Sequence, residues 1–105
     1  MTRRFWTAAC LLVAWPAAAQ DSWSVAAQIG GVIASERACG VQLDPGAIEA
    51  YIAARVDPDD LEFTSALGLH TRGVGREIEN MSDSLRVAHC AQIRRVVEAY
   101  NLSAD

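Results

Sequence analysis

Two cysteines, Cys39 and Cys90, lie about half the chain apart in a sequence of 105 residues. Joined as a disulfide, they would close a loop of about 51 residues, which the chain-entropy model values at roughly 4 kcal/mol. This is a large share of the total stability of about 5–15 kcal/mol that is usual for a protein. Whether the pair forms depends on the compartment, because distant thiols join and persist in oxidising surroundings.

The N-terminal segment indicates that compartment. A basic start, an apolar run over residues 5–15 and small residues over 16–19 follow the order of a secretory signal peptide. We predict that residues 1–19 are removed, which leaves 20–105 as a single domain, without stable membrane insertion, in the bacterial periplasm or medium. An uncleaved anchor is a second interpretation, although the apolar run is roughly half of the about 20 residues that a span needs. A lipoprotein attached at Cys10 is a third.

The expected mature domain is acidic and contains no lysine. Of the nine arginines, two lie in the signal segment, so seven remain against thirteen Asp and Glu, a net charge of −6. Such a domain repels phosphate backbones, which argues against nucleic acid as a partner. Arginine as the sole strong base, with abundant alanine, is typical of GC-rich bacterial genomes and favours the periplasm over a eukaryotic secretory route.

The apolar spacing predicts an all-α fold, a small bundle of four helices joined by short turns. The first helix is expected from Ser22 or Trp23 to Ala38, with Gly40 as its left-handed cap. The adjacent glycines at 30 and 31 suggest that another helix packs closely there.

Two Asp-Pro pairs predict the next two helices, because Asp caps a helix and Pro suits its first position. The second helix begins at Asp44-Pro45 and stops before Asp57-Pro58, where the third begins. The third continues to about Met81, and its glycines at Gly73–Gly75 predict a kink or break there. The fourth begins within residues 82–84 and carries a broad apolar face.

The helical spacing places both distant cysteines on apolar stripes. Cys39 shares a stripe with Val32, and Cys90 shares one with Ile93 and Val97. Both sulfurs should therefore point inward and tie the end of the first helix to the middle of the last. The remaining interpretation is a reactive thiol pair, which the absence of a Cys-x-x-Cys motif disfavours.

An acidic cluster consists of Asp57, Asp59, Asp60 and Glu62. Carboxylates at a helix N-terminus interact favourably with the free amide groups and the helix dipole, so we interpret the cluster as capping. A weak cation site is the alternative, but the spacing does not fit an EF-hand loop, which needs glycine at its sixth position.

His70 and His89 are the only histidines of the chain. We expect both to be partly buried structural residues. If the third and fourth helices pack antiparallel, the two rings could meet. They would then form a metal site with Met81 or Glu77, or a pair that responds to acid.

The candidates for partner binding are three. Trp23 either closes one end of the core or anchors a partner, and the other two are Arg72 and Arg76 in the glycine-rich segment. No serine elbow, phosphate loop or haem attachment motif is present, so we expect no enzyme and no cofactor.

In gross design, a short exported helical chain with one long-range disulfide, the sequence is similar to periplasmic acid-stress chaperones. No residue motif extends this similarity to a family. We therefore expect a non-enzymatic protein that binds another protein of the cell envelope, in an accessory, inhibitory or stress-protective role. A metal- or pH-sensing protein that uses His70 and His89, or a small enzyme, are the alternatives.

Overall fold

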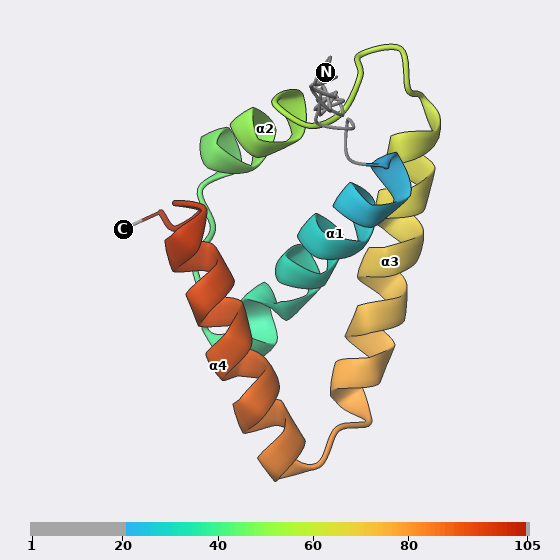
Figure 1. The fold of residues 1–105 in the computed structure, drawn as a ribbon. Helices are drawn as coiled ribbons and strands as arrows, with labels where there is room; N and C mark the ends of the chain where they lie inside the picture. Colours follow the sequence, from blue (N-terminus) through green and yellow to red (C-terminus); the bar gives the residue numbers. More distant parts are fainter. Residues whose placement is uncertain (1–20, 105) are drawn as a thin grey trace, which may run out of the picture.

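A computed structural model describes residues 21–104, and the predicted signal peptide lies outside this range. The described chain confirms the all-α prediction with its four helices (Figure 1). In chain order they are α1 (Ser22–Cys39), α2 (Pro45–Ala53), α3 (Glu62–Glu79) and α4 (Asp83–Ala99).

Local capping explains three of the helix starts. The carboxylate of Asp21 accepts a hydrogen bond from the backbone N–H of Trp23, and that of Asp44 accepts one from Gly46. At the start of α4, the hydroxyl of Ser82 accepts from the N–H of Leu85. The end of α1 is also as predicted, because Gly40 adopts a left-handed conformation with φ of 64°.

The predicted start of the third helix at Asp57-Pro58 is wrong, since α3 begins at Glu62. The carboxylate of Asp57 accepts from the N–H of Asp59, and the carbonyl of Asp57 accepts from the N–H of Asp60. These bonds form a turn, which Asp residues favour as readily as a helix start. The carboxylate of Asp60 then accepts from the N–H of Glu62, so the acidic cluster binds backbone amides along this turn.

The predicted break near Gly73–Gly75 is also absent, because α3 is continuous from Glu62 to Glu79. A mid-helix glycine costs about 1 kcal/mol relative to alanine. Buried side chains near both ends, Phe63 and Ile78, hold the helix in place across this weaker stretch.

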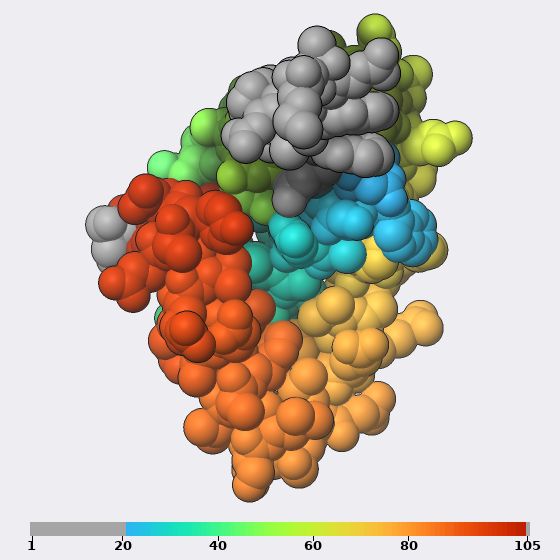
Figure 2. Space-filling model, in the orientation of Figure 1, coloured from blue at the N-terminus to red at the C-terminus, as the bar shows by residue number. Residues whose placement is uncertain are grey.

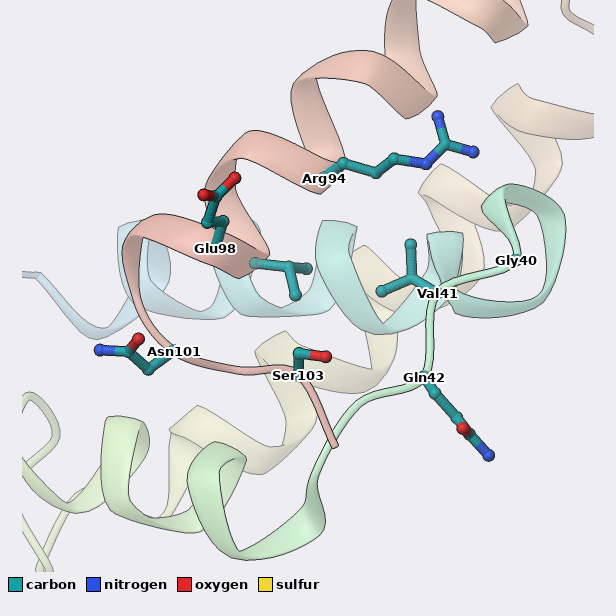
Figure 3. Close-up of a pocket in the computed structure, with 8 residues that line it drawn as sticks. Gly40, Val41, Gln42, Arg94, Glu98, Asn101 and Ser103 are labelled. Atoms are coloured by element: carbon teal, nitrogen blue, oxygen red, sulfur yellow. The ribbon is translucent and has the colours of Figure 1, made fainter. Parts of the chain in front are cut away.

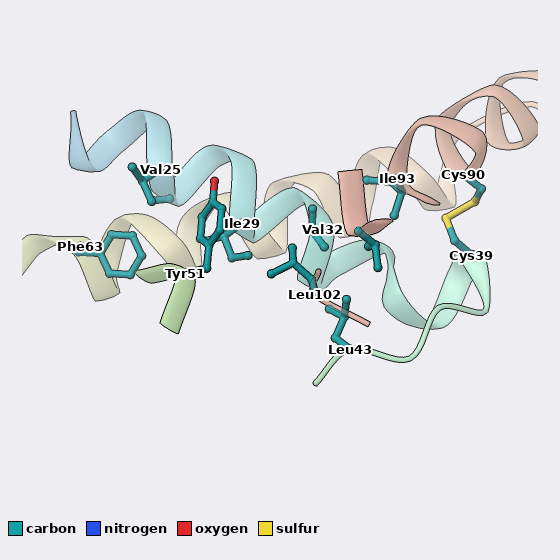
Figure 4. Close-up of a cluster of buried hydrophobic side chains, with 12 residues drawn as sticks. Val25, Ile29, Val32, Cys39, Leu43, Tyr51, Phe63, Cys90, Ile93 and Leu102 are labelled. Carbon is teal, nitrogen blue, oxygen red and sulfur yellow. A yellow bond between two sulfur atoms is a disulfide. The ribbon is translucent and has the colours of Figure 1, made fainter. Parts of the chain in front are cut away.

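The core forms around α1, which packs against α3 on one side and α4 on the other (Figure 1). In the space-filling view, the surface of α1 is visible between these two helices (Figure 2). Figure 4 shows the buried side chains along α1, from Phe63 at one end to the disulfide at the other. The apolar core residues are Val25, Ala26, Ile29, Val32, Leu43, Tyr51, Phe63, Ile93, Val97 and Leu102.

The two adjacent glycines of α1 have different surroundings. A Cβ on Gly30 would lie 3.1 Å from the Cβ of His70 and 3.4 Å from the carbonyl oxygen of Leu67, so α3 approaches closely here. A Cβ on Gly31 would meet nothing within 4 Å. The expectation of close helix packing is therefore confirmed for Gly30 and wrong for Gly31.

The Cys39–Cys90 disulfide is present as predicted and joins the end of α1 to the middle of α4. Both cysteines are buried. Arg94 reaches from α4 toward the same end of α1 (Figure 3), where its guanidinium donates to the carbonyl of Cys39 at 2.9 Å.

The C-terminal tail returns to the loop between α1 and α2. The N–H of Asp44 donates to the carbonyl of Leu102 at 2.9 Å, and the N–H of Ala104 donates to that of Gln42 at 2.9 Å. Leu102 is almost fully buried at 1 % exposure. The tail therefore fixes the end of α4 beside the start of α2.

Candidate functional site: a groove between α1, α2 and α4

An apolar groove of about 250 Å³ opens where α1, α2, α4 and the C-terminal tail meet. Its lining residues come from all four segments and are mostly apolar or aromatic. They are Gln28, Ile29, Gly31, Val32, Tyr51, Ile93, Val96, Tyr100 and Leu102.

The local sequence explains why this space stays open. Gly31 contributes no side chain on the groove face of α1, and its Cβ position is free of neighbours. The short helix α2 contributes a single buried residue, Tyr51, which lies beside Ile29 of α1 (Figure 4). The groove is therefore bounded by side chains of different helices, and α1 contributes no side chain to it at position 31.

Two tyrosines form the aromatic wall of the groove. The rings of Tyr51 and Tyr100 meet edge to face, with centroids 5.5 Å apart and planes at 84°. Tyr51 is buried, whereas Tyr100 is 49 % exposed. Large aromatic side chains that stay accessible beside a pocket are typical of binding surfaces.

The polar groups of this region are arranged around Tyr51. Its hydroxyl donates to the side-chain oxygen of Gln28 at 3.1 Å. The guanidinium of Arg55 lies 3.7 Å from the Tyr51 ring centroid and 5.4 Å from that of Tyr100. Arg55 also donates to the carbonyl of Tyr51 at 3.0 Å, which holds the cation over both rings.

Burial raises the pKa of Tyr51 above its ordinary value of 10.0, because the phenolate loses hydration there. The positive charge of Arg55 partly opposes this effect, and Tyr100 adds slightly to it. Tyr51 therefore remains a neutral hydrogen-bond donor throughout the physiological range of pH.

In a Tyr100→Phe variant, Tyr51 is the only tyrosine of the chain. Its phenol should titrate with a midpoint above pH 10.0, because burial raises its pKa. The unfolded chain releases this proton first, so stability should fall as pH rises from 10.0 through the folded pKa. Phenolate absorbance against pH measures the midpoint, and urea unfolding at a series of pH values above 10.0 measures the stability. The same variant unfolded in denaturant is the control and should return to the ordinary value. A folded midpoint at or below 10.0 would contradict the burial of Tyr51.

The two histidines lie far apart, so the expectation that their rings could meet is wrong. His70 contacts Trp23 edge to face at 4.4 Å between ring centroids, whereas His89 Nε2 lies 2.8 Å from the hydroxyl of Ser35. Trp23 and Ser35 are twelve positions apart on α1, which corresponds to about 18 Å along the helix. Among residues 21–104, no group of three or more His, Cys, Asp and Glu side chains could hold a metal ion.

The two histidines differ in their surroundings: His89 forms a hydrogen bond with Ser35, whereas His70 packs against the ring of Trp23. The hydroxyl of Ser35 donates its one hydrogen to the carbonyl of Gly31 at 2.6 Å, so His89 Nε2 carries the hydrogen that joins it to Ser35. His70 Nε2 is buried and has no hydrogen-bond partner within the described range.

The three residues predicted for partner binding do not form one surface. Trp23 is 51 % exposed and rests on His70, so it neither closes the core fully nor stands free. Arg72 and Arg76 are exposed on α3. At 100° per residue, Arg72 is about 200° around that helix from His70 and therefore away from Trp23.

Sequence reasoning missed the groove residues Gln28, Gly31, Tyr51 and Tyr100, and the neighbouring Arg55. One local signal was available, since Tyr51 and Arg55 are one helical turn apart. The contribution of Tyr100 depends on the returning tail, which has no such signal.

Comparisons with models of protein families, with curated proteins and with solved structures find no match. Across residues 21–104, none of the helices has the length and hydropathy to cross a membrane.

Proposed function

We propose that this protein is a non-enzymatic binding protein of the bacterial cell envelope, which binds an apolar part of another protein in the groove between α1, α2 and α4. The observation that carries this proposal is the apolar groove of about 250 Å³ beside the half-exposed ring of Tyr100. Pockets that accept a large side chain of a partner are where binding energy concentrates in protein interfaces.

Two observations support the envelope as its location. The Cys39–Cys90 disulfide suits an oxidising compartment, because reducing systems keep such thiols apart in the cytosol. Residues 1–19 have the pattern of a signal peptide. Such a groove would serve an accessory, an inhibitory or a stress-protective role.

The chemistry of the groove favours binding over catalysis. Its polar side chains include the amide of Gln28 and the phenol of Tyr51, which are bonded to each other. Neither group accepts a proton near neutral pH, because the pKa of Tyr51 is raised and an amide is not a base. A guanidinium is not a proton acceptor either, so Arg55 adds no base beside the groove.

Photocrosslinking in living bacteria tests this proposal. With a photoreactive phenylalanine in place of Tyr100 of the full chain, illumination should join the protein to a defined envelope partner. The same group at Leu61, which is 83 % exposed in the turn before α3, is the control and should give no such product.

A groove-filling substitution makes the test specific. Gly31→Leu should remove the crosslinked product, because the new side chain enters the open space of the groove. Gly73→Leu, at a second mid-helix glycine with open space around it, should leave the product unchanged. A product that survives Gly31→Leu would show that the groove is not the binding site.

A further inference from the structure

We propose that the groove selects a partner segment in which one large apolar side chain is flanked by carboxylates. This inference rests on the proposed function and adds the chemistry of the segment. It follows from the size of the groove and from the charges beside it.

The size of the groove matches one side chain. An engineered apolar cavity of about 150 Å³ accepts benzene, and pockets for drug-sized molecules usually have about 300–1,000 Å³. The groove, at about 250 Å³, lies between these limits. One aromatic or long aliphatic side chain therefore fits, with the segment's backbone left at the mouth.

Arg55 places a positive charge next to this space. Its guanidinium lies within 5.4 Å of the centroids of both tyrosine rings that line the groove. A guanidinium has five N–H donors, and within residues 21–104 one hydrogen bond of Arg55 is formed, to the carbonyl of Tyr51. The remaining donors suit a carboxylate, which binds Arg in a bidentate manner.

Arg95 supplies a second cation on the α4 side. It lines a shallow hollow that shares Val96 and Tyr100 with the groove. Within the described residues, its one hydrogen bond joins it to Gln92 on the same helix. Two arginines thus lie near Tyr100, Arg55 against its ring and Arg95 in the hollow that Tyr100 lines.

The nearby acidic residues leave Arg55 as the main cation beside the groove. Glu98 lines the same hollow as Arg95 and follows it by three positions, so the two side chains are neighbours on α4 and Glu98 offsets part of the charge of Arg95. Glu49 is about 200° around α2 from Tyr51 and is exposed. The expected mature chain has a net charge of −6, with seven arginines against thirteen acidic residues. The positive charge beside the groove is therefore local and differs in sign from the domain as a whole.

Two labelled peptides test the charge preference. The probes are amidated, fluorescein-labelled Glu-Glu-Trp-Glu-Glu and Lys-Lys-Trp-Lys-Lys, and fluorescence anisotropy measures their binding to the oxidised protein. We expect the acidic peptide to bind at least about tenfold more tightly, and added salt to weaken this binding. Non-specific attraction to an acidic protein would favour the lysine peptide, so it cannot produce this result.

Matched variants locate the effect. Arg55→Gln should weaken binding of the acidic peptide about tenfold, and Arg95→Gln should weaken it by a smaller factor. Arg37→Gln, which removes an exposed arginine from the last turn of α1, should have no effect and is the control. Equal affinities for the two peptides, or equal effects of Arg55→Gln and Arg37→Gln, would overturn the inference.

The groove-filling variant separates failure of this inference from failure of the proposed function. If both peptides bind equally and Gly31→Leu abolishes both, the charge preference fails while the groove remains a protein-binding site. If Gly31→Leu leaves peptide binding unchanged, both proposals fail. If phenylpropionate binds and neither peptide does, the groove takes a small carboxylate, which overturns the inference and the proposed function together.

Discussion

A Cys90→Ser variant should lose about 4 kcal/mol of its free energy of unfolding, because the unfolded chain is released from a loop closed across 51 positions. The architecture makes this crosslink important. α1 packs against α3 along much of its length, whereas its contact with α4 is more limited and includes the disulfide at its end. The loss is comparable with the total stability of a small domain, so we expect the variant to be largely unfolded at 37 °C.

Urea unfolding of oxidised and reduced protein measures this effect without any substitution. The reduced wild type and the Cys90→Ser variant should have similar midpoints, both well below that of the oxidised wild type. The Cys39→Ser/Cys90→Ser double variant is the matched control and should lose no more than the single variant, since both remove the same bond. Coincident midpoints for oxidised and reduced wild type would contradict the predicted role of the disulfide.

Gly30→Leu and Gly31→Leu should change stability in opposite directions, although the residues are adjacent. At Gly30, the new Cβ would lie 3.1 Å from the Cβ of His70 and 3.4 Å from a backbone oxygen of α3, which cannot move alone. Forcing α1 and α3 apart should cost about 3 kcal/mol, the upper part of the usual range for overpacking. At Gly31 the space is open, so replacing a mid-helix glycine should stabilise the domain by about 1 kcal/mol.

Thermal or urea unfolding of the two variants, compared with wild type, gives both signs in one experiment. Gly73→Leu is the control, because it shares the gain from removing a mid-helix glycine but has no neighbour within 4 Å. It should resemble Gly31→Leu. If Gly30→Leu proved as stable as Gly31→Leu, the close approach of α3 at Gly30 would be wrong.

The parts of the fold that were predictable depend on neighbours in the chain. Asp21, Asp44 and Ser82 each accept a hydrogen bond from a backbone N–H two or three residues later. The local sequence is therefore enough to indicate these helix starts. The inward direction of Cys39 and Cys90 follows from helical spacing for the same reason. The Asp57-Pro58 pair shows where this reasoning ends, since a turn and a helix start use the same residues in competing hydrogen bonds.

Helical periodicity and capping act over a few residues, so the four helices and the two cysteines able to join them could be predicted from the amino-acid sequence. The close packing of α3 against Gly30, the open space at Gly31 and the contacts among Tyr51, Arg55 and Tyr100 are visible only in the folded chain. Those outcomes depend on how whole helices cross and on the tail that returns to Asp44. Such contacts join residues far apart in the chain, and no local pattern encodes them.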